Sequence, residues 1–276
     1  MIRILVDSAS DVSHINSENI TVVPLSVTIN DKTYLDGVEL GHDEFYEMLT
    51  ATETFPKSSQ PSPQSFAEAF EQAKEAGDEL ICILLSGGVS GTCQSARIAK
   101  ELVEYDNIHI VDSLTGSYGV YLLVQQAQKM IQQGHTAQEI VAEIESLKER
   151  VMVYLSVDTL EYLYRGGRLS KTSALIGGVA KIKPVIYVTG EGKIGVFNKQ
   201  IGISRAINAL VDVAKNNPAD TDHAFYTICT AGTHNIEMLE SKLAENSVQV
   251  TQRIQMGPVV GTHAGPEAFG IIYIRK

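Results

Sequence analysis

The first half of the chain alternates between short apolar runs and longer amphipathic stretches. Residues 2–6, 79–85 and 108–111 are almost continuously apolar, which is typical of strands buried on both faces of a sheet. Helical patterns lie between and after these runs, at residues 63–76 and 92–105, with a third that ends at Gln133. This alternation predicts an α/β fold whose mainly parallel sheet is flanked by helices.

The second half of the chain mixes strands and helices less regularly. Strand patterns are found at residues 151–157, 184–188, 195–198, 224–229, 248–255 and 269–274, with helical patterns over 203–215 and 237–244. Two of these strands flank a turn, so this half predicts a mixed sheet with hairpins. We therefore predict two α/β domains, residues 1–155 and residues 156–276.

Four segments carry turn or capping signals. Asn30-Asp31 separates residues 21–29 from 32–35 and predicts a hairpin. Three prolines within residues 54–63 predict an extended segment outside regular structure, and the glycines and prolines of residues 256–266 predict a loop. Ser170 is a candidate cap for a helix over residues 174–180.

Composition narrows the class of protein. The 276 residues carry a net charge of −11, which disfavours nucleic acid or an anionic membrane surface as the main partner. No apolar run approaches the ~18 residues of a spanning helix, so stable membrane insertion is not expected. The three separated cysteines form neither a disulfide framework nor a metal motif, and we expect a cytoplasmic protein without a metal or cofactor.

A glycine-rich stretch, residues 84–96, joins the apolar run at 79–85 to a helix that starts near Thr92. Gly87, Gly88 and Gly91 alternate with the hydroxyl residues Ser86, Ser90 and Thr92. Free backbone N–H groups at a helix start favour an anion, and no lysine follows Gly91 as in a triphosphate loop. The stretch therefore indicates a site for a small, singly charged anion such as a carboxylate, or simply a tight turn that requires glycine.

Three further candidates receive structural interpretations. Asp7 or Ser8, at the end of the first strand, is expected to cap the following turn. Cys93 lies near a helix start but has no evident base beside it, so it is not expected to act as a nucleophile. Residues 190–195 read G-x-G-x-x-G but lead into a strand, so they predict a hairpin turn and not a dinucleotide site.

The chain resembles the DegV family, which includes the fatty-acid-binding subunit of bacterial fatty acid kinase. The resemblance runs nearly end to end and rests on the motifs Asp7-Ser-Ala-Ser-Asp11, Ser58-Ser-Gln-Pro-Ser62, Ser86-Gly-Gly-Val-Ser-Gly-Thr92, Leu160-Glu-Tyr-Leu-Tyr-Arg-Gly-Gly-Arg-Leu169, Lys183-Pro184 and His263-Ala-Gly-Pro266. It implies that one long-chain fatty acid lies between two α/β domains. It further implies that Ser58, Ser90 and His263 hold the carboxylate, and that Arg168 contacts the ligand or a kinase subunit.

This chain departs from the family pattern at two positions. Ser58 stands where the family has Thr, and Gly87 replaces the second residue of a usual Ser-Ser pair. Which apolar side chains line the acyl tunnel is open, since Leu163, Leu175 and Ile176 suit an ordinary core equally well.

Three functions remain to be weighed. The leading hypothesis is a carrier without chemistry of its own, which presents the fatty acid to a separate ATP-dependent kinase subunit. A serine hydrolase for acyl esters is the alternative, with Ser90, His263 and Asp7 or Asp112 as a triad, although Thr92 replaces the second glycine of the nucleophile elbow. A sugar or nucleotide kinase is disfavoured because no phosphate-binding lysine is present.

Overall fold

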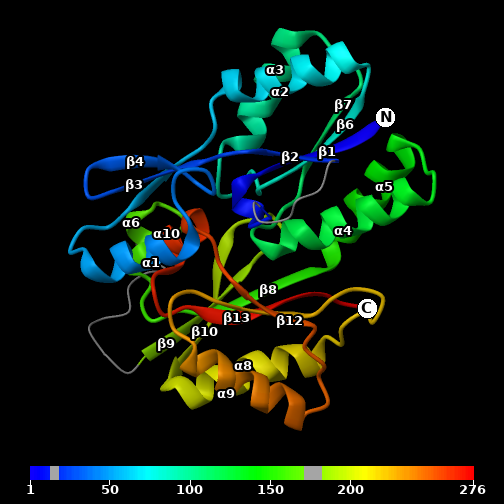
Figure 1. Ribbon diagram of the computed structural model, residues 1–276. Coiled ribbons are helices and arrows are strands. Elements are labelled where there is room, and N and C mark those ends of the chain that lie inside the picture. Colours follow the sequence, from blue (N-terminus) through cyan, green and yellow to red (C-terminus); the bar gives the residue numbers. More distant parts are fainter. Residues whose placement is uncertain (13–18, 171–181) are drawn as a thin grey trace.

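The first half of the chain folds around a parallel four-stranded sheet. The computed structural model describes residues 1–12, 19–170 and 182–276. The strand order is β2-β1-β6-β7, with bounds β1 Ile2–Asp7, β2 Ile20–Val23, β6 Glu79–Leu84 and β7 Ile108–Asp112. Four helices cover it: α2 (Pro63–Ala76) and α3 (Thr92–Val103) on one face, α4 (Tyr118–Gln132) and α5 (Ala137–Leu147) on the other (Figure 1).

Side chains of β6 point alternately to the two faces of the sheet, which explains why helices cover both faces. Cys82 and Leu84 pack against α2 and α3, whereas Ile81 and Ile83 pack toward α4 and α5. Each face therefore buries a separate apolar layer, as the continuous apolar run predicts. Local signals set the helix ends: Ser62 caps α2 with Pro63 in its first turn, and Gly77 ends it with a φ of 65°.

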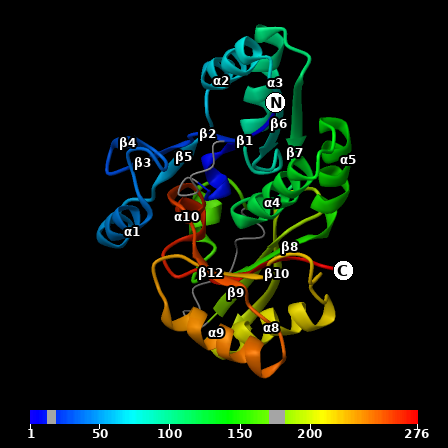
Figure 2. The same ribbon diagram turned by 45° about the vertical axis from the view of Figure 1, so that its right-hand side comes forward.

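The second half forms a mixed six-stranded sheet with the order β10-β9-β8-β13-β11-β12. Its strands are β8 Val151–Ser156, β9 Ile182–Val188, β10 Ile194–Ile201, β11 Tyr226–Cys229, β12 Gln252–Gln255 and β13 Phe269–Ile274. The helices α8 (Ile203–Asn216) and α9 (His234–Glu245) cover one face, and α4 lies between the other face and the parallel sheet (Figures 1 and 2). The predicted boundary at residue 155 falls within β8, whose partner strands belong to this sheet.

A third, three-stranded sheet lies beside the junction of the other two, with the order β4-β3-β5. Its strands are β3 Ser26–Ile29, β4 Lys32–Leu35 and β5 Lys57–Ser59, and α1 (His42–Ala51) follows β4. The Asn30-Asp31 hairpin is confirmed, with positive φ at both residues. The strand expected over residues 21–29 is instead two strands, β2 and β3, in different sheets.

Two predicted loops are regular structure. Residues 57–59 pair antiparallel with β3 although prolines stand on both sides, because β5 is an edge strand. Residues 256–266 contain the helix α10 (Pro258–Ala264), which has Pro258 in its first turn. Gly261 lies inside this helix because a Cβ there would overlap Phe45 and Tyr46 of α1. The helix proposed over 174–180 lies outside the described residues.

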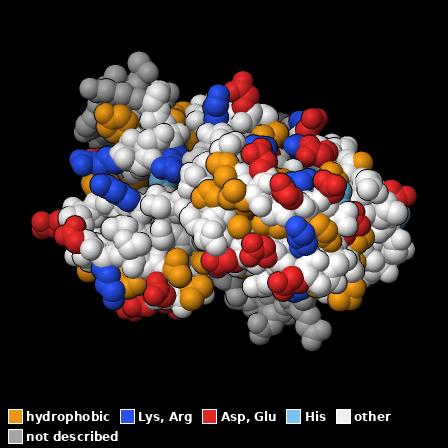
Figure 3. Space-filling model, turned by 90° about the horizontal axis from the view of Figure 1, so that it is seen from above, with side chains coloured by type: hydrophobic (Ala, Val, Ile, Leu, Met, Phe, Trp, Pro, Cys, Tyr) orange, Lys and Arg blue, Asp and Glu red, His pale blue; other side chains and the backbone are white. Residues whose placement is uncertain are grey.

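The predicted fold class is confirmed: an α/β chain with a flanked parallel sheet followed by a mixed sheet. Within the described ranges, no helix is both long and apolar enough to cross a bilayer. Figure 3 looks down on the molecule from the α2–α3 end, where acidic, basic and apolar side chains are intermingled.

Candidate functional site

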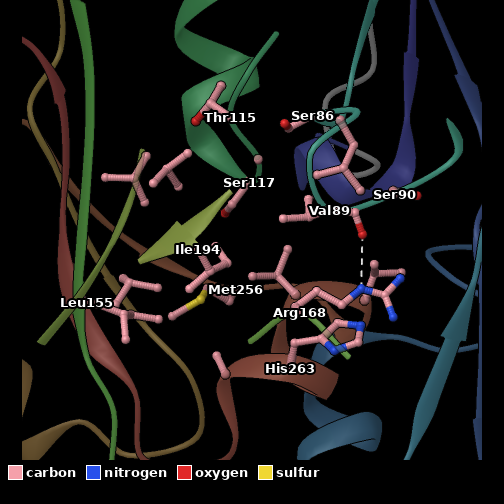
Figure 4. A pocket seen from close by; sticks show the side chains of 18 of the residues that line it. Ser86, Val89, Ser90, Thr115, Ser117, Leu155, Arg168, Ile194, Met256 and His263 are labelled. Carbon is pink, nitrogen blue, oxygen red and sulfur yellow. Dashed lines mark hydrogen bonds between the residues drawn. The ribbon is translucent and has the colours of Figure 1, made fainter. Parts of the chain in front are cut away.

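A pocket lies between the parallel sheet and the six-stranded sheet. Its empty volume, open mouth included, is about 890 Å³. Ser58, Ser90, Arg168 and His263, which we call the polar end, all line it, and Figure 4 shows Ser90, Arg168 and His263 gathered on one side. They come from four segments: β5, the loop before α3, the turn after α6 (Glu161–Arg165), and α10.

The loop of residues 86–91 is held by contacts on several sides. The Ser86 N–H donates to the Thr115 carbonyl, and the Ser86 hydroxyl donates to the Gly192 carbonyl at 2.8 Å. The Gly87 N–H donates to the Asp112 carboxylate at 3.1 Å. The G-x-G-x-x-G segment is the predicted β9–β10 hairpin turn, and it closes against this loop because Gly88 leaves room for the Gly192 carbonyl.

Ser90 stands at the start of α3. Its hydroxyl lies 2.8 Å from the buried hydroxyl of Thr92, the first residue of the helix. A ligand oxygen beside Ser90 would also be close to the positive end of the α3 dipole. The Cys93 thiol is buried here, and burial raises its pKa to about 12, so the expectation that it is no nucleophile agrees with its environment.

Ser58 and His263 form a direct hydrogen bond across 205 residues of sequence. The Ser58 Oγ and His263 Nε2 atoms are 2.8 Å apart. Burial, with a second contribution from the Arg168 charge, lowers the pKa of His263 to about 3. The imidazole is therefore neutral at physiological pH.

Arg168 joins the two halves of the polar end. Its Nε donates to the Val89 carbonyl at 3.0 Å (dashed line in Figure 4), and its Nη1 donates to the Gly166 carbonyl at 2.6 Å. Burial lowers the pKa of the half-buried guanidinium, but an arginine still carries its charge at physiological pH. Two of its five N–H donors have partners among the described residues, and Arg168 also lines the pocket.

Apolar side chains make up most of the remaining pocket surface. The face of the six-stranded sheet turned away from α8 and α9 supplies the set that we call the apolar wall: Val153, Leu155, Ile186, Val188, Ile194, Ile228 and Ile272. Figure 4 shows Leu155 and Ile194 on the side opposite His263. Leu163 also lines the pocket, whereas Leu175 and Ile176 lie outside the described residues.

Three buried carboxyl groups support the loops behind the polar end. Asp7 accepts hydrogen bonds from the Leu85 and Ala9 N–H groups, so its predicted capping role is confirmed. Asp11 accepts from the Ser117 hydroxyl and the Gly257 N–H. Burial raises the pKa of Asp7 to about 6 and that of Asp36 to about 7, and it raises that of Asp11 strongly.

The structure thus places all four residues named from the sequence around one pocket. Ser58 and His263 are bonded to each other, and Arg168 reaches the Ser90 loop through Val89. Sequence reasoning missed the roles of Val89 and Gly166, which act through backbone carbonyls that no side-chain pattern reveals. It also missed Asp36, whose burial depends on the fold of the three-stranded sheet.

The family of the chain follows from comparison with known proteins. The family model described as "Uncharacterised protein, DegV family" matches residues 1–276. A DegV domain-containing protein of Caldanaerobacter subterraneus is 36% identical over 280 residues, which cover 100% of this chain and 99% of that relative. One from Listeria innocua is 35% identical over 263 residues, covering 93% of this chain and 92% of the relative.

Solved structures agree over the whole chain. A fatty acid binding DegV family protein from Streptococcus agalactiae superposes with a TM-score of 0.90 at 29% identity, covering 100% of this chain and 99% of that one. A stearic-acid-binding protein from Eubacterium ventriosum gives 0.88 at 27% identity with the same coverage. This chain belongs to the DegV family.

Proposed function

We propose that the chain binds one long-chain fatty acid in this pocket, with the carboxylate at the polar end and the acyl chain along the apolar wall. One observation carries the proposal: a mostly apolar pocket has its arginine, its histidine and two of its serine hydroxyls, those of Ser58 and Ser90, together at one end. Each buried methylene contributes ~0.8 kcal/mol, and an unpaired buried carboxylate would cost several kcal/mol. The relatives named for fatty acid binding support the same ligand.

We further propose that the protein is a cytoplasmic carrier that presents this acid to a separate ATP-dependent kinase subunit and performs no chemistry alone. This part rests on the resemblance to the fatty acid kinase subunit. The half-buried Arg168 brings positive charge to the polar end, where a phosphoryl group would arrive.

The serine hydrolase alternative gains no support from the geometry. His263 bonds to Ser58 and not to Ser90, and its Nδ1 has no carboxylate partner among the described residues. Asp7 and Asp112 accept from backbone N–H groups instead. An imidazole whose pKa is about 3 is also a poor general base near neutral pH.

The test of the ligand is direct. Lipid extracted from the purified protein and analysed by mass spectrometry should contain about one long-chain fatty acid per chain. Lipid-free protein should bind a fatty acid again, and failure to do so would overturn the proposal. For the carrier role, ADP release is measured with ATP and with the kinase subunit or this chain omitted in turn; activity of this chain alone contradicts that role.

A further inference from the structure

The two nitrogen atoms of His263 have different surroundings. Nε2 lies 2.8 Å from the Ser58 hydroxyl. Nδ1 is buried and has no hydrogen-bond partner within the described residues. It faces Gly166, where an added Cβ would overlap it. Because the φ of Gly166 is an ordinary −72°, backbone strain does not explain a glycine here, whereas this contact does.

These surroundings favour one tautomer. The neutral ring carries one proton, on Nδ1 or on Nε2. A proton on Nδ1 would be a buried donor without an acceptor among the described residues, beside the space that a Cβ of Gly166 would occupy, and the Arg168 charge would repel it. The same charge attracts a lone pair on Nδ1, so the proton belongs on Nε2.

The tautomer fixes the direction of the hydrogen bond to Ser58. With a proton on Nε2, His263 donates and the Ser58 oxygen accepts, so the Ser58 hydroxyl proton must point elsewhere. Ser58 lines the pocket, and a ligand there meets this hydroxyl as a donor. The N–H groups of Arg168, which also lines the pocket, are donors as well. This part of the polar end then suits an ionised carboxylate, which only accepts, better than an alcohol of equal chain length.

We propose that His263 is a positioning residue that acts through Ser58: with its proton held on Nε2 by Gly166 and Arg168, it makes Ser58 an obligate donor and so selects the ionised acid. This inference rests on the proposed function, since it assigns how the head group of that ligand is recognised. It separates two neighbouring roles, with Ser58 touching the ligand and His263 orienting Ser58.

The first test does not depend on ligand binding. Long-range ¹H–¹⁵N correlation spectra distinguish the tautomers of histidine, and His263→Gln identifies the signal of His263 among the seven histidines. We expect a neutral ring protonated on Nε2 from pH 5 to pH 8. A proton on Nδ1, or a cationic ring at pH 6, overturns the inference even if the protein binds fatty acids.

The second test compares hexadecanoate with hexadecan-1-ol at pH 8. A glutamine amide can donate from about the position of Nε2, whereas an asparagine amide cannot reach it. We expect His263→Asn to weaken hexadecanoate binding about tenfold and leave the alcohol within about twofold, with His263→Gln retaining most of the preference. Equal losses in both variants, or equal losses for both ligands, contradict the inference.

A third variant tests Gly166. Its change to Ala should displace the imidazole and weaken hexadecanoate binding about tenfold. Gly190→Ala is the matched control, because a Cβ there meets no atom within 4 Å. An unchanged His263 signal and unchanged affinity in Gly166→Ala would show that Gly166 does not position the imidazole. If wild-type protein binds no fatty acid, the proposed function fails while the tautomer measurement still stands.

Discussion

The two ends of the pocket are built in different ways. The polar end draws its four side chains from segments up to 205 residues apart and joins them by hydrogen bonds of defined direction. The apolar wall is one face of one sheet, where alternate residues of neighbouring strands contribute interchangeable aliphatic groups. Recognition of the head group therefore depends on single atoms, whereas accommodation of the acyl chain depends on total apolar surface.

The largest effect is expected from Arg168→Ala. This change removes a charge facing the proposed carboxylate and also the bond to the Val89 carbonyl. We expect fatty acid binding to weaken by about 2–5 kcal/mol and acyl phosphate formation with the kinase subunit to fall accordingly. Arg165→Ala is the control, since Arg165 is exposed and pairs with Glu161. Ligand displacement titrations measure the fatty acid affinity of both variants. Equal losses of affinity in the two would contradict a special role for Arg168.

The next largest losses of affinity are expected from the hydroxyl groups of Ser58 and Ser90. Ser58→Ala and Ser90→Ala should each weaken binding by about 1–3 kcal/mol, because a buried acceptor loses a donor. The double variant should lose less than the sum if both serve one carboxylate. Ser59→Ala provides the comparison within β5, since its side chain is exposed and does not line the pocket. Unchanged affinity in both single variants would exclude these hydroxyls from the site.

The stability contributed by the buried carboxyl groups behind the polar end should depend on pH, whereas the contribution of the apolar wall should not. The folded chain retains the protons of Asp7 and Asp36 up to about pH 6 and 7, whereas the unfolded chain releases them near 3.8. Their stabilising contribution is therefore complete below pH 3.8 and lost as pH rises through 6 to 7. We expect urea unfolding to show about 4 kcal/mol less stability at pH 8 than at pH 5 from this source.

Two variants sharpen this measurement. Asp36→Asn should reduce the pH dependence of the unfolding free energy, because the amide cannot ionise. Asp31→Asn should leave that dependence unchanged, since Asp31 lies in the exposed hairpin turn. If the unfolding free energy of Asp36→Asn varies with pH as steeply as that of the wild-type protein, the pH dependence comes from other groups.

The smallest effect per atom is expected at the wall. Leu155→Ala enlarges the pocket and removes ligand contacts at ~0.8 kcal/mol per methylene, so the preferred chain length should shift while selection of the carboxylate persists. Met152→Ala, on the same strand but facing α8, should lower stability without changing the chain-length profile. A parallel series of saturated acids measures both, and identical profiles would mean that Leu155 does not contact the ligand.

The fold was largely predictable because its signals are local. The run before Leu84 and the caps of α2 required only neighbouring residues. The prediction that residues 57–59 lack regular structure was wrong because their strand exists only through pairing with β3. The prediction of a loop at 256–266 was wrong because Gly261 reflects packing against α1 and not flexibility.

The site was predictable only in part. The glycine-rich segment indicated an anion site from its own sequence, but nothing in the spacing of Ser58 and His263 brings them together. Their meeting depends on β5 pairing with β3 and on α10 packing beside it. Before the structure, only the resemblance to the DegV family related the two residues.

The loop of residues 86–91 also limits how this protein can diverge. Its residues form hydrogen bonds with Thr115, Gly192, Asp112 and Arg168, which lie in separate parts of the chain. An insertion or deletion there would break several of these bonds at once, whereas a change between aliphatic residues on the sheet breaks none. A lineage descended from this protein is therefore expected to change its preferred acyl chain through the sheet and to inherit the loop at fixed length.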